Sequence, residues 1–189
     1  MYGSYKKKFN EKDKLKPINP YGFLKKKVEE LIIQKSKNNY KYLILRFFNV
    51  AGIQHSNNVD MSISKSVISI IIQKIKTNKI FHLLGNNFNT KDGTTERDFI
   101  HVSDIVKIIE NSIQYLIKKN QNNIVNCGTG KKTSIKDIIC LVKKNITLKI
   151  FNKNLGDPDS VVSDNKKLIK LKLIRKFKNI NQIVNSYYY

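Results

Sequence analysis

The 189-residue chain has little alanine and little arginine: Ala51 is its one alanine, and only Arg46, Arg97 and Arg175 are arginines among 36 basic residues. Its formal net charge of +22 would attract polyanions such as nucleic acid. Arginine, however, is the side chain best suited to phosphates and base edges. The abundance of lysine, asparagine and isoleucine is what AT-rich codons encode, so we favour solvated lysine surfaces over a nucleic-acid-binding module.

Cysteine and long apolar runs are also scarce. The two cysteines, Cys127 and Cys140, form no disulfide framework and show no metal-binding spacing with histidine, so we expect no metal. The longest apolar stretch, Val67 to Ile72, is interrupted by Ser69 and is far shorter than the roughly 20 residues that span a bilayer. The N-terminus has no signal-peptide pattern. We therefore expect a cytoplasmic protein with no membrane contact.

Helical and strand-like hydrophobic periods alternate along the chain, which predicts an α/β fold. The opening through Lys16 is polar and lysine-rich, and it is expected to be a loop. The first helix should start at Asn19-Pro20 and carry an apolar stripe. Further helices are predicted over residues 61–76, from Ser103-Asp104 to about residue 119, behind a capping box of Ser134 and Asp137, and after Asp164; strands are predicted at 42–48, 80–84 and 124–127.

The most informative stretch is Gly93 to Val102, with the sequence Gly-Thr-Thr-Glu-Arg-Asp-Phe-Ile-His-Val. Three other motifs accompany it in a fixed order: Asn19-Pro20-Tyr21 with Lys25, Arg46-Phe47-Phe48-Asn49, and Asn126-Cys127-Gly128-Thr129-Gly130. Together they resemble the UDP-glucose 4-epimerases, which are sugar-nucleotide members of the extended short-chain dehydrogenase/reductase family. The resemblance covers nearly the whole chain, from Tyr2 to about Asn185.

The resemblance implies the C-terminal part of a Rossmann-type enzyme with its small substrate-binding lobe and without the first βαβ units. Residues 1–60 would be a remnant of the dinucleotide-binding domain; residues 61–189 would mainly form the lobe, with 101–130 packing back on the sheet. No Gly-x-Gly-x-x-Gly turn occurs in the sequence, and twenty residues precede Tyr21. We expect a truncated chain of low activity, with unpaired sheet edges and apolar faces.

Tyr-x-x-x-Lys occurs three times, as Tyr2/Lys6, Tyr21/Lys25 and Tyr115/Lys119, so the motif alone is a weak signal. Only the middle pair opens a helix behind Asn-Pro, and its four-residue spacing places both side chains on one helical face. A phenol with a pKa of about 10 needs a nearby cation to act as a base at neutral pH. The resemblance implies that Tyr21 and Lys25 are catalytic and also bind NAD, which the chain alone should bind poorly.

The family resemblance also implies a set of substrate-binding residues. Asn49 would face the diphosphate, Arg97 would reach it as a bidentate cation, and Asp157 would hold the uridine ribose. Asn154 stands where the family commonly has an arginine. The alternatives are a turn-stabilising role for Asn49 and a solvated pair of Arg97 with Asp92 or Glu96. Further substrate contacts are implied for Ser66, Val67, His82 and Leu84, and structural roles for Asp98 and His101.

The implied reaction is the interconversion of UDP-glucose and UDP-galactose through transient hydride transfer to NAD. The partners would be a UDP-sugar and either a separately encoded N-terminal half or a second copy in a homodimer. Three alternatives remain open: the C-terminal half of a split epimerase, another NAD-dependent nucleotide-sugar epimerase or dehydratase, and, less favoured, a basic nucleic-acid-binding module whose binding would depend steeply on salt.

Overall fold

The structure is a computed structural model that describes residues 2–3, 8–36, 40–54, 66–142, 146–154 and 156–188. It confirms the predicted α/β class. The elements are α1 (Pro20–Lys35), β1 (Leu43–Phe47), β2 (Asn49–Ala51), α2 (Val67–Lys76), β3 (Phe81–Leu84), β4 (Glu96–Arg97), β5 (Phe99–His101), α3 (Val102–Lys119), β6 (Asn123–Cys127), β7 (Thr133–Ser134), α4 (Ile135–Leu141), β8 (Leu148–Phe151), β9 (Ser160–Val161), α5 (Lys166–Lys170) and α6 (Ile180–Asn185).

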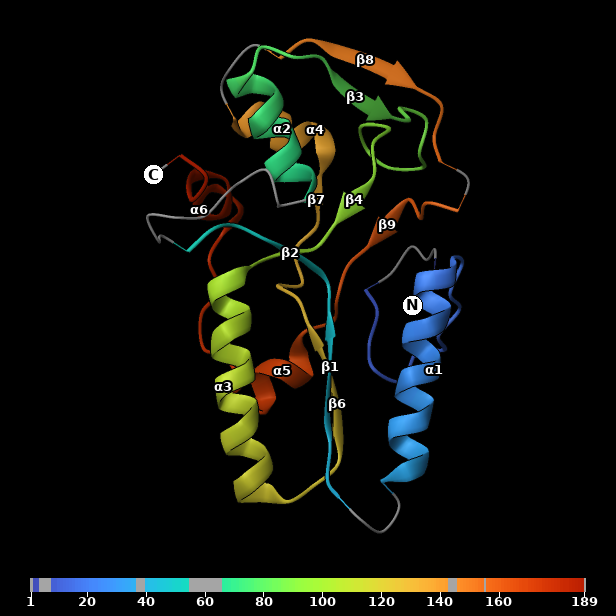
Figure 1. Ribbon diagram of the computed structural model, residues 1–189, viewed down its shortest axis with the longest axis vertical. Coiled ribbons are helices and arrows are strands. Elements are labelled where there is room, and N and C mark those ends of the chain that lie inside the picture. The colour runs from blue at the N-terminus through green and yellow to red at the C-terminus, as the bar shows by residue number, and fades with distance from the viewer. Residues whose placement is uncertain are drawn as a thin grey trace.

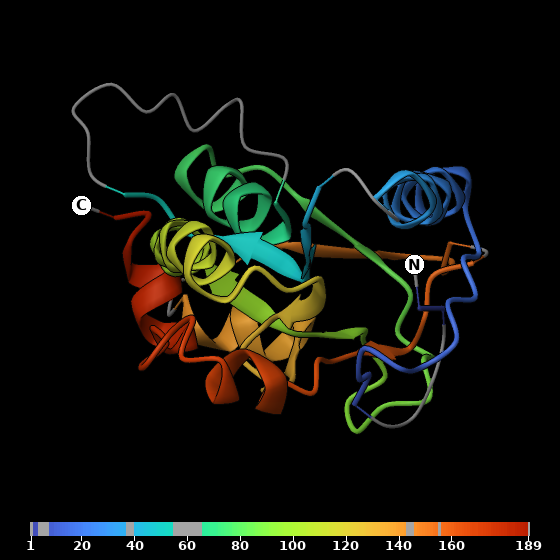
Figure 2. The ribbon, with the colours of Figure 1, turned by 90° about the horizontal axis from the view of Figure 1, so that it is seen from below.

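A parallel pair of strands, β1 and β6, organises the lower half of the molecule in Figure 1. Helices lie on both sides of this pair, with α1 on one side and α3 on the other, as both ribbon views show (Figures 1 and 2). Buried side chains from α3, β5, β6, α5 and the residues just after α5 form the lower core: Ile100, Ile105, Ile108, Val125, Cys127, Leu168, Leu173 and Ile174. The tail of the chain therefore packs against the sheet through α5.

The upper half of the molecule contains α2, α4, α6, the parallel pair β3–β8 and the three-stranded sheet β7–β4–β9 (Figure 1). Isoleucines recur at helical spacing in α2, and Ile68, Ile71 and Ile72 are fully buried. With side chains of β3, α4 and α6 they form the upper core. Within the described ranges, no helix has both the length and the apolar character needed to cross a membrane.

Most predicted helix starts are confirmed, but the cap of α3 and the first residue of α2 differ from the prediction. Asn19 caps α1, and the capping box of Ser134 and Asp137 is present at α4. The cap of α3, however, is His101, whose Nδ1 accepts from the Ser103 N–H at 3.0 Å, so the prediction that Ser103-Asp104 caps this helix is wrong. Burial lowers the pKa of His101, which favours the neutral ring that can accept this bond.

The helix predicted over residues 61–76 begins only at Val67, behind a cap by Ser66, and residues 61–65 lie outside the described part of the chain. The C-terminal segment contains a further helix, α6, which the sequence analysis did not predict. Asn179 and Gln182 form a capping box there, and Ile183 and Val184 are buried in the upper core. That capping pattern before aliphatic residues was a usable signal in the sequence.

Asp98 joins the two halves of the molecule. Its side chain is fully buried. Its Oδ1 accepts from the backbone N–H and the hydroxyl of Thr129 at 2.8 and 2.7 Å, and its Oδ2 accepts from Gly130 N at 3.0 Å and from Ser163 N at 3.1 Å. A Cβ on Gly128 would lie 2.4 Å from Asp98 Oδ2, so only glycine fits there. The structural role expected for Asp98 agrees with these contacts.

We predict that Asp98→Ala lowers the free energy of unfolding by about 2–4 kcal/mol, because the buried donors of Thr129, Gly130 and Ser163 lose their acceptor. Urea denaturation followed by circular dichroism measures this change. The matched control is Asp164→Ala, which removes a carboxylate that accepts one exposed bond from Lys166 N at 3.0 Å. Equal destabilisation by both substitutions would contradict a special role for Asp98.

Candidate active site

The first turn of α1 presents the Tyr21/Lys25 pair. Pro20 occupies the first position of the helix, and Asn19 Oδ1 accepts from the Gly22 N–H at 2.8 Å, which fixes where the helix begins. Tyr21 is 70% exposed, and Lys25 Nζ lies 5.5 Å from the centre of its ring. The predicted placement of both side chains on one helical face is therefore what the structure shows.

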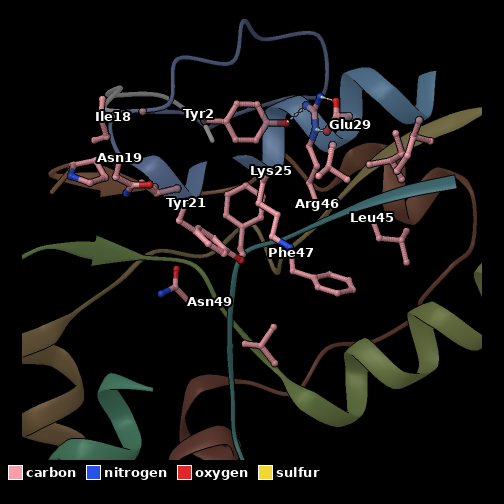
Figure 3. A pocket seen from close by; sticks show the side chains of 18 residues that line it. Tyr2, Ile18, Asn19, Tyr21, Lys25, Glu29, Leu45, Arg46, Phe47 and Asn49 are labelled. Carbon is pink, nitrogen blue, oxygen red and sulfur yellow. Dashed lines mark hydrogen bonds and ion pairs between the residues drawn. The ribbon is translucent and has the colours of Figure 1, made fainter. Parts of the chain in front are cut away.

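A cavity of about 690 Å³ lies between α1 and β1. Figure 3 shows Tyr21 and Lys25 reaching from α1 toward the strand, with Asn49 and Phe47 across from them. The walls of the cavity are mainly aliphatic and aromatic, with a few polar groups among them. A cavity of this size and chemistry can hold a small organic molecule with an apolar ring and a few hydroxyl groups.

A buried ion pair holds α1 against β1. Glu29 and Arg46 are each less than 10% exposed; Arg46 Nε donates to Glu29 Oε2 at 3.0 Å, and Nη2 donates to the other carboxylate oxygen. Arg46 Nη1 also donates to the Tyr2 hydroxyl at 2.6 Å, and that hydroxyl donates to Asn126 Oδ1 at 2.6 Å (Figure 3). The cluster thus ties the N-terminal segment, α1, β1 and β6 together.

The electrostatics of this cluster agree with its hydrogen bonds. Burial alone would lower the pKa of Arg46, but the hydrogen bonds and charge of Glu29 and the contact with Tyr2 raise it. Burial raises the pKa of Tyr2, so its hydroxyl keeps the proton that it donates to Asn126. Sequence reasoning missed Glu29 and Tyr2. The available signal was Arg46 inside an apolar strand, since a buried guanidinium needs a carboxylate partner.

Two of the predicted diphosphate contacts lie at or next to the cavity. Asn49 lines it, and its backbone N–H donates to Asp98 O at 3.0 Å. Arg97 lies on β4, and its Nη1 donates to the carbonyl of Pro158, a lining residue, at 2.8 Å. The Glu96 carboxylate pairs with Lys132 at 2.9 Å, so Arg97 is not held in a surface pair with it. Burial lowers the pKa of Arg97, whereas Asp157 and Asp159 oppose that shift.

The other predicted substrate residues are not among those that line the cavity. Ser66 caps α2, and its Oγ lies 3.0 Å from the Tyr187 hydroxyl; Val67 is the first residue of α2. His82 and Leu84 share the exposed face of β3. Asp157 is exposed in a loop, where its N–H donates to Asn154 O at 3.3 Å. Their contacts with a substrate remain predictions.

The class of protein follows from a family match. Residues 1–128 match the NAD dependent epimerase/dehydratase family, and the chain belongs to this family. A UDP-glucose 4-epimerase from Lactobacillus helveticus is 33% identical over 175 residues, which are 88% of this chain and 53% of that protein. The chain thus spans about half the length of the curated relatives it matches. The resemblance predicted from the motifs is confirmed.

Solved structures show the same fold. A UDP-glucose 4-epimerase from Stenotrophomonas maltophila, crystallised with NAD and formylated UDP-arabinopyranose, superposes with a TM-score of 0.89 at 21% identity and covers 99% of this chain and 59% of its own. A UDP-Glc/GlcNAc 4-epimerase from Campylobacter jejuni has 30% identity and a TM-score of 0.74, covering 99% of this chain and 60% of its own. The Rossmann-type fold expected from the sequence is therefore confirmed.

We predict that Glu29→Ala lowers the free energy of unfolding by about 3–5 kcal/mol, because it leaves the buried charge of Arg46 without its partner. Amide hydrogen exchange should show α1 opening more easily, and urea denaturation gives the size of the loss. The neighbouring Glu30→Ala is the control, since Glu30 pairs with Lys26 and Lys27 on the surface; it should leave the unfolding midpoint almost unchanged. A similar loss in both variants would refute the conclusion that the buried pair of Glu29 and Arg46 holds α1 against β1.

Proposed function

We propose that this chain carries the proton-transfer site and much of the substrate-binding part of a UDP-glucose 4-epimerase, with NAD as cofactor. The observation that carries the proposal is the placement of Tyr21 and Lys25 on one face of α1, directed into a cavity that Asn49 lines from the other side. The Lactobacillus helveticus relative has the same activity in its name. On its own, the chain should be weakly active, because Tyr21 is largely exposed to water.

The residues around the cavity fit the nicotinamide riboside end of NAD. Lys25 offers an ammonium donor for ribose hydroxyls, and the aliphatic side chains of Val28, Ile32 and Ile44 offer apolar walls for a flat ring. NAD, when bound, would accept the hydride from carbon 4 of the sugar and return it to the opposite face. The fit of the lining residues applies only to the nicotinamide riboside end of NAD.

The chain's own residues would move the proton and hold the substrate. The Tyr21 oxygen would take the proton from the sugar 4-hydroxyl and give it back after the sugar has turned over. Lys25 places its ammonium group 5.5 Å from the centre of the Tyr21 ring, and a nearby cation favours the phenolate form that can take up a proton. Asn49 would donate its amide to the diphosphate, and Arg97 would supply the opposing positive charge.

The sugar could also differ from glucose. A putative UDP-arabinose 4-epimerase from Arabidopsis thaliana is 30% identical over 164 residues. The Lactobacillus helveticus and Arabidopsis thaliana relatives are both named 4-epimerases. The proposed pair of Tyr21 and Lys25 acts only on the hydroxyl at carbon 4 of the sugar. UDP-sugars other than UDP-glucose are therefore the second candidate substrates.

The proposal is tested in a chimera in which this chain replaces the matching segment of the Lactobacillus helveticus enzyme. We predict that the chimera interconverts UDP-glucose and UDP-galactose and that Tyr21→Phe lowers kcat by at least about 100-fold, because the general base is lost. Turnover is followed by chromatography of the two UDP-sugars.

The control for this test is Tyr115→Phe, since Tyr115/Lys119 has the same spacing but lies on α3. Its hydroxyl accepts from Asn123 Nδ2 at 3.1 Å, so the substitution removes a tyrosine hydroxyl that lies away from the cavity. Tyr115→Phe should leave kcat nearly unchanged. A chimera that stays active with Tyr21→Phe would show that another group takes the proton.

We further predict that Asn154→Arg tightens UDP binding to the chimera by one to two orders of magnitude. A bidentate charged contact is worth about 1.5–3 kcal/mol, and each 1.4 kcal/mol is about tenfold in affinity. Arg97→Ala should weaken UDP binding, and Arg97→Lys should recover part of the loss because it keeps the charge without the fork. Calorimetry with UDP measures these affinities. An unchanged affinity in all variants would mean that neither position 97 nor position 154 contacts the diphosphate.

A further inference from the structure

A second cavity, of about 450 Å³, lies where the N-terminal end of α3 meets α6. Three segments build it: the residues that follow β2, the first turns of α3, and α6 with the residue Lys178 before it. The lining residues are Ile53, Gln54, Ser103, Lys107, Lys178, Gln182, Asn185 and Ser186. None of them lines the cavity beside Tyr21, so the second cavity is a separate candidate site.

The charged groups of this lining are all positive. Lys107 lies on α3 and Lys178 lies just before α6, and no acidic residue is among the lining residues that the structure describes. Within the described ranges, neither lysine forms an ion pair. The neighbouring acid, Asp104, is buried, and its Oδ2 accepts from the backbone N–H of Lys178 at 2.8 Å. That bond does not engage the Lys178 ammonium group.

The ionisation of His101 shows where the charge of Lys178 acts. Burial lowers the pKa of His101, the positive charge of Lys178 lowers it further, and Asp104 opposes the shift. The ring of His101 is hydrogen-bonded to Ser103, whose N–H donates to its Nδ1 at 3.0 Å. Lys178 therefore directs its charge to the side of the cavity that Ser103 lines.

The uncharged polar groups of the lining include a further donor. Gln182 Oε1 accepts from the Asn179 N–H at 2.9 Å in the capping box of α6, so its amide nitrogen is the end left for the cavity. Ser186 Oγ accepts from Ile53 N at 2.9 Å and donates to Ile183 O at 2.7 Å, which makes it part of the wall. Ammonium groups can only donate. A lining rich in donors and positive charge favours a ligand that is an anion rich in acceptors.

We propose that this cavity binds a small phosphate-bearing anion. Its oxygens accept from the ammonium groups of Lys107 and Lys178 and from the amide of Gln182. A phosphate group offers several strong acceptor oxygens and a charge of about −1.5 to −2 at pH 7, and lysine binds it as a point charge. A single carboxylate carries half the charge that two ammonium groups can match.

The size of the cavity favours a phosphate ester over inorganic phosphate. A volume of about 450 Å³ is in the range of pockets that hold small organic ligands. The lining is polar except for Ile53, so the organic part of the ligand should carry hydroxyl groups, as a sugar phosphate does. This inference goes beyond the proposed epimerase activity, since the two cavities share no lining residue.

The experiment titrates the whole chain by calorimetry at low ionic strength, where exposed charges are screened least. The probes are ribose 5-phosphate, inorganic phosphate and succinate. Saturable one-to-one binding of ribose 5-phosphate is expected, tighter than that of succinate. Equal affinity for ribose 5-phosphate and inorganic phosphate would support the site with the phosphate group alone as its ligand. Absence of saturable binding by both phosphates, or tighter binding of succinate, would overturn the proposal.

Charge variants test the position of the site. Lys107→Met and Lys178→Met should each weaken ribose 5-phosphate binding about five- to tenfold, and Lys178→Arg should keep most of the affinity. The matched control is Lys118→Met, which removes the same charge from the exposed surface at the other end of α3 and should stay within about twofold. Equal weakening by Lys118→Met would show that only the net charge attracts the anion, and it would overturn the site.

Nuclear magnetic resonance separates this site from the proposed active site. Backbone amide resonances of Ser103, Gln182 and Asn185 should shift saturably with ribose 5-phosphate, while that of Asn49 stays in place. Arg97→Ala, which should weaken UDP binding, should leave ribose 5-phosphate binding unchanged. Shifts centred on Asn49, or loss of binding in Arg97→Ala, would overturn the second site. Binding is scored without turnover, so an inactive chimera overturns only the proposed function.

Discussion

The buried pair of Glu29 and Arg46 is the interaction on which the site depends. Helix α1 buries little of its own apolar surface, since Leu24, Val28 and Leu31 are exposed, so packing alone cannot set its position. The guanidinium of Arg46 instead fixes the helix to β1 through two hydrogen bonds to one carboxylate. Desolvating two charges is costly, so the pair specifies geometry more than it adds stability. That geometry keeps Tyr21 and Lys25 directed into the cavity.

A second polar centre, Asp98, serves the same purpose on the other side of the cavity. It gathers donors from Thr129, Gly130 and Ser163, and the neighbouring Asn49 donates its N–H to the Asp98 carbonyl. Asn49 is thereby placed at the cavity while β4 and Arg97 are held close to the loop at Pro158. The two buried carboxylates, Glu29 and Asp98, thus position opposite walls of one site.

The motifs predicted much of the fold and the placement of Tyr21 and Lys25 on α1. Asn19-Pro20 indicated where α1 begins, and the spacing of Tyr21 and Lys25 indicated that they share a face; local geometry decides both. Arg46 inside an apolar strand indicated that a carboxylate partner exists. The sequence could not single out Glu29 and Tyr2, because Arg46 and, for Tyr2, Asn126 are distant from them along the chain. His101 was not foreseen as the cap of α3 because a neutral histidine is an unusual cap, and burial is what keeps it neutral.

By itself, the sequence determined the α/β class, the family and the pair at the start of α1, since these follow from short-range periodicity and from motifs in a fixed order. Only the tertiary structure decided which predicted residues meet. Asn49 faces Tyr21 across the cavity, whereas Ser66 is bonded to Tyr187 and His82 lies on a different strand pair. Contacts between distant segments depend on the pairing of β1 with β6 and on buried charges, whose partners no local pattern specifies.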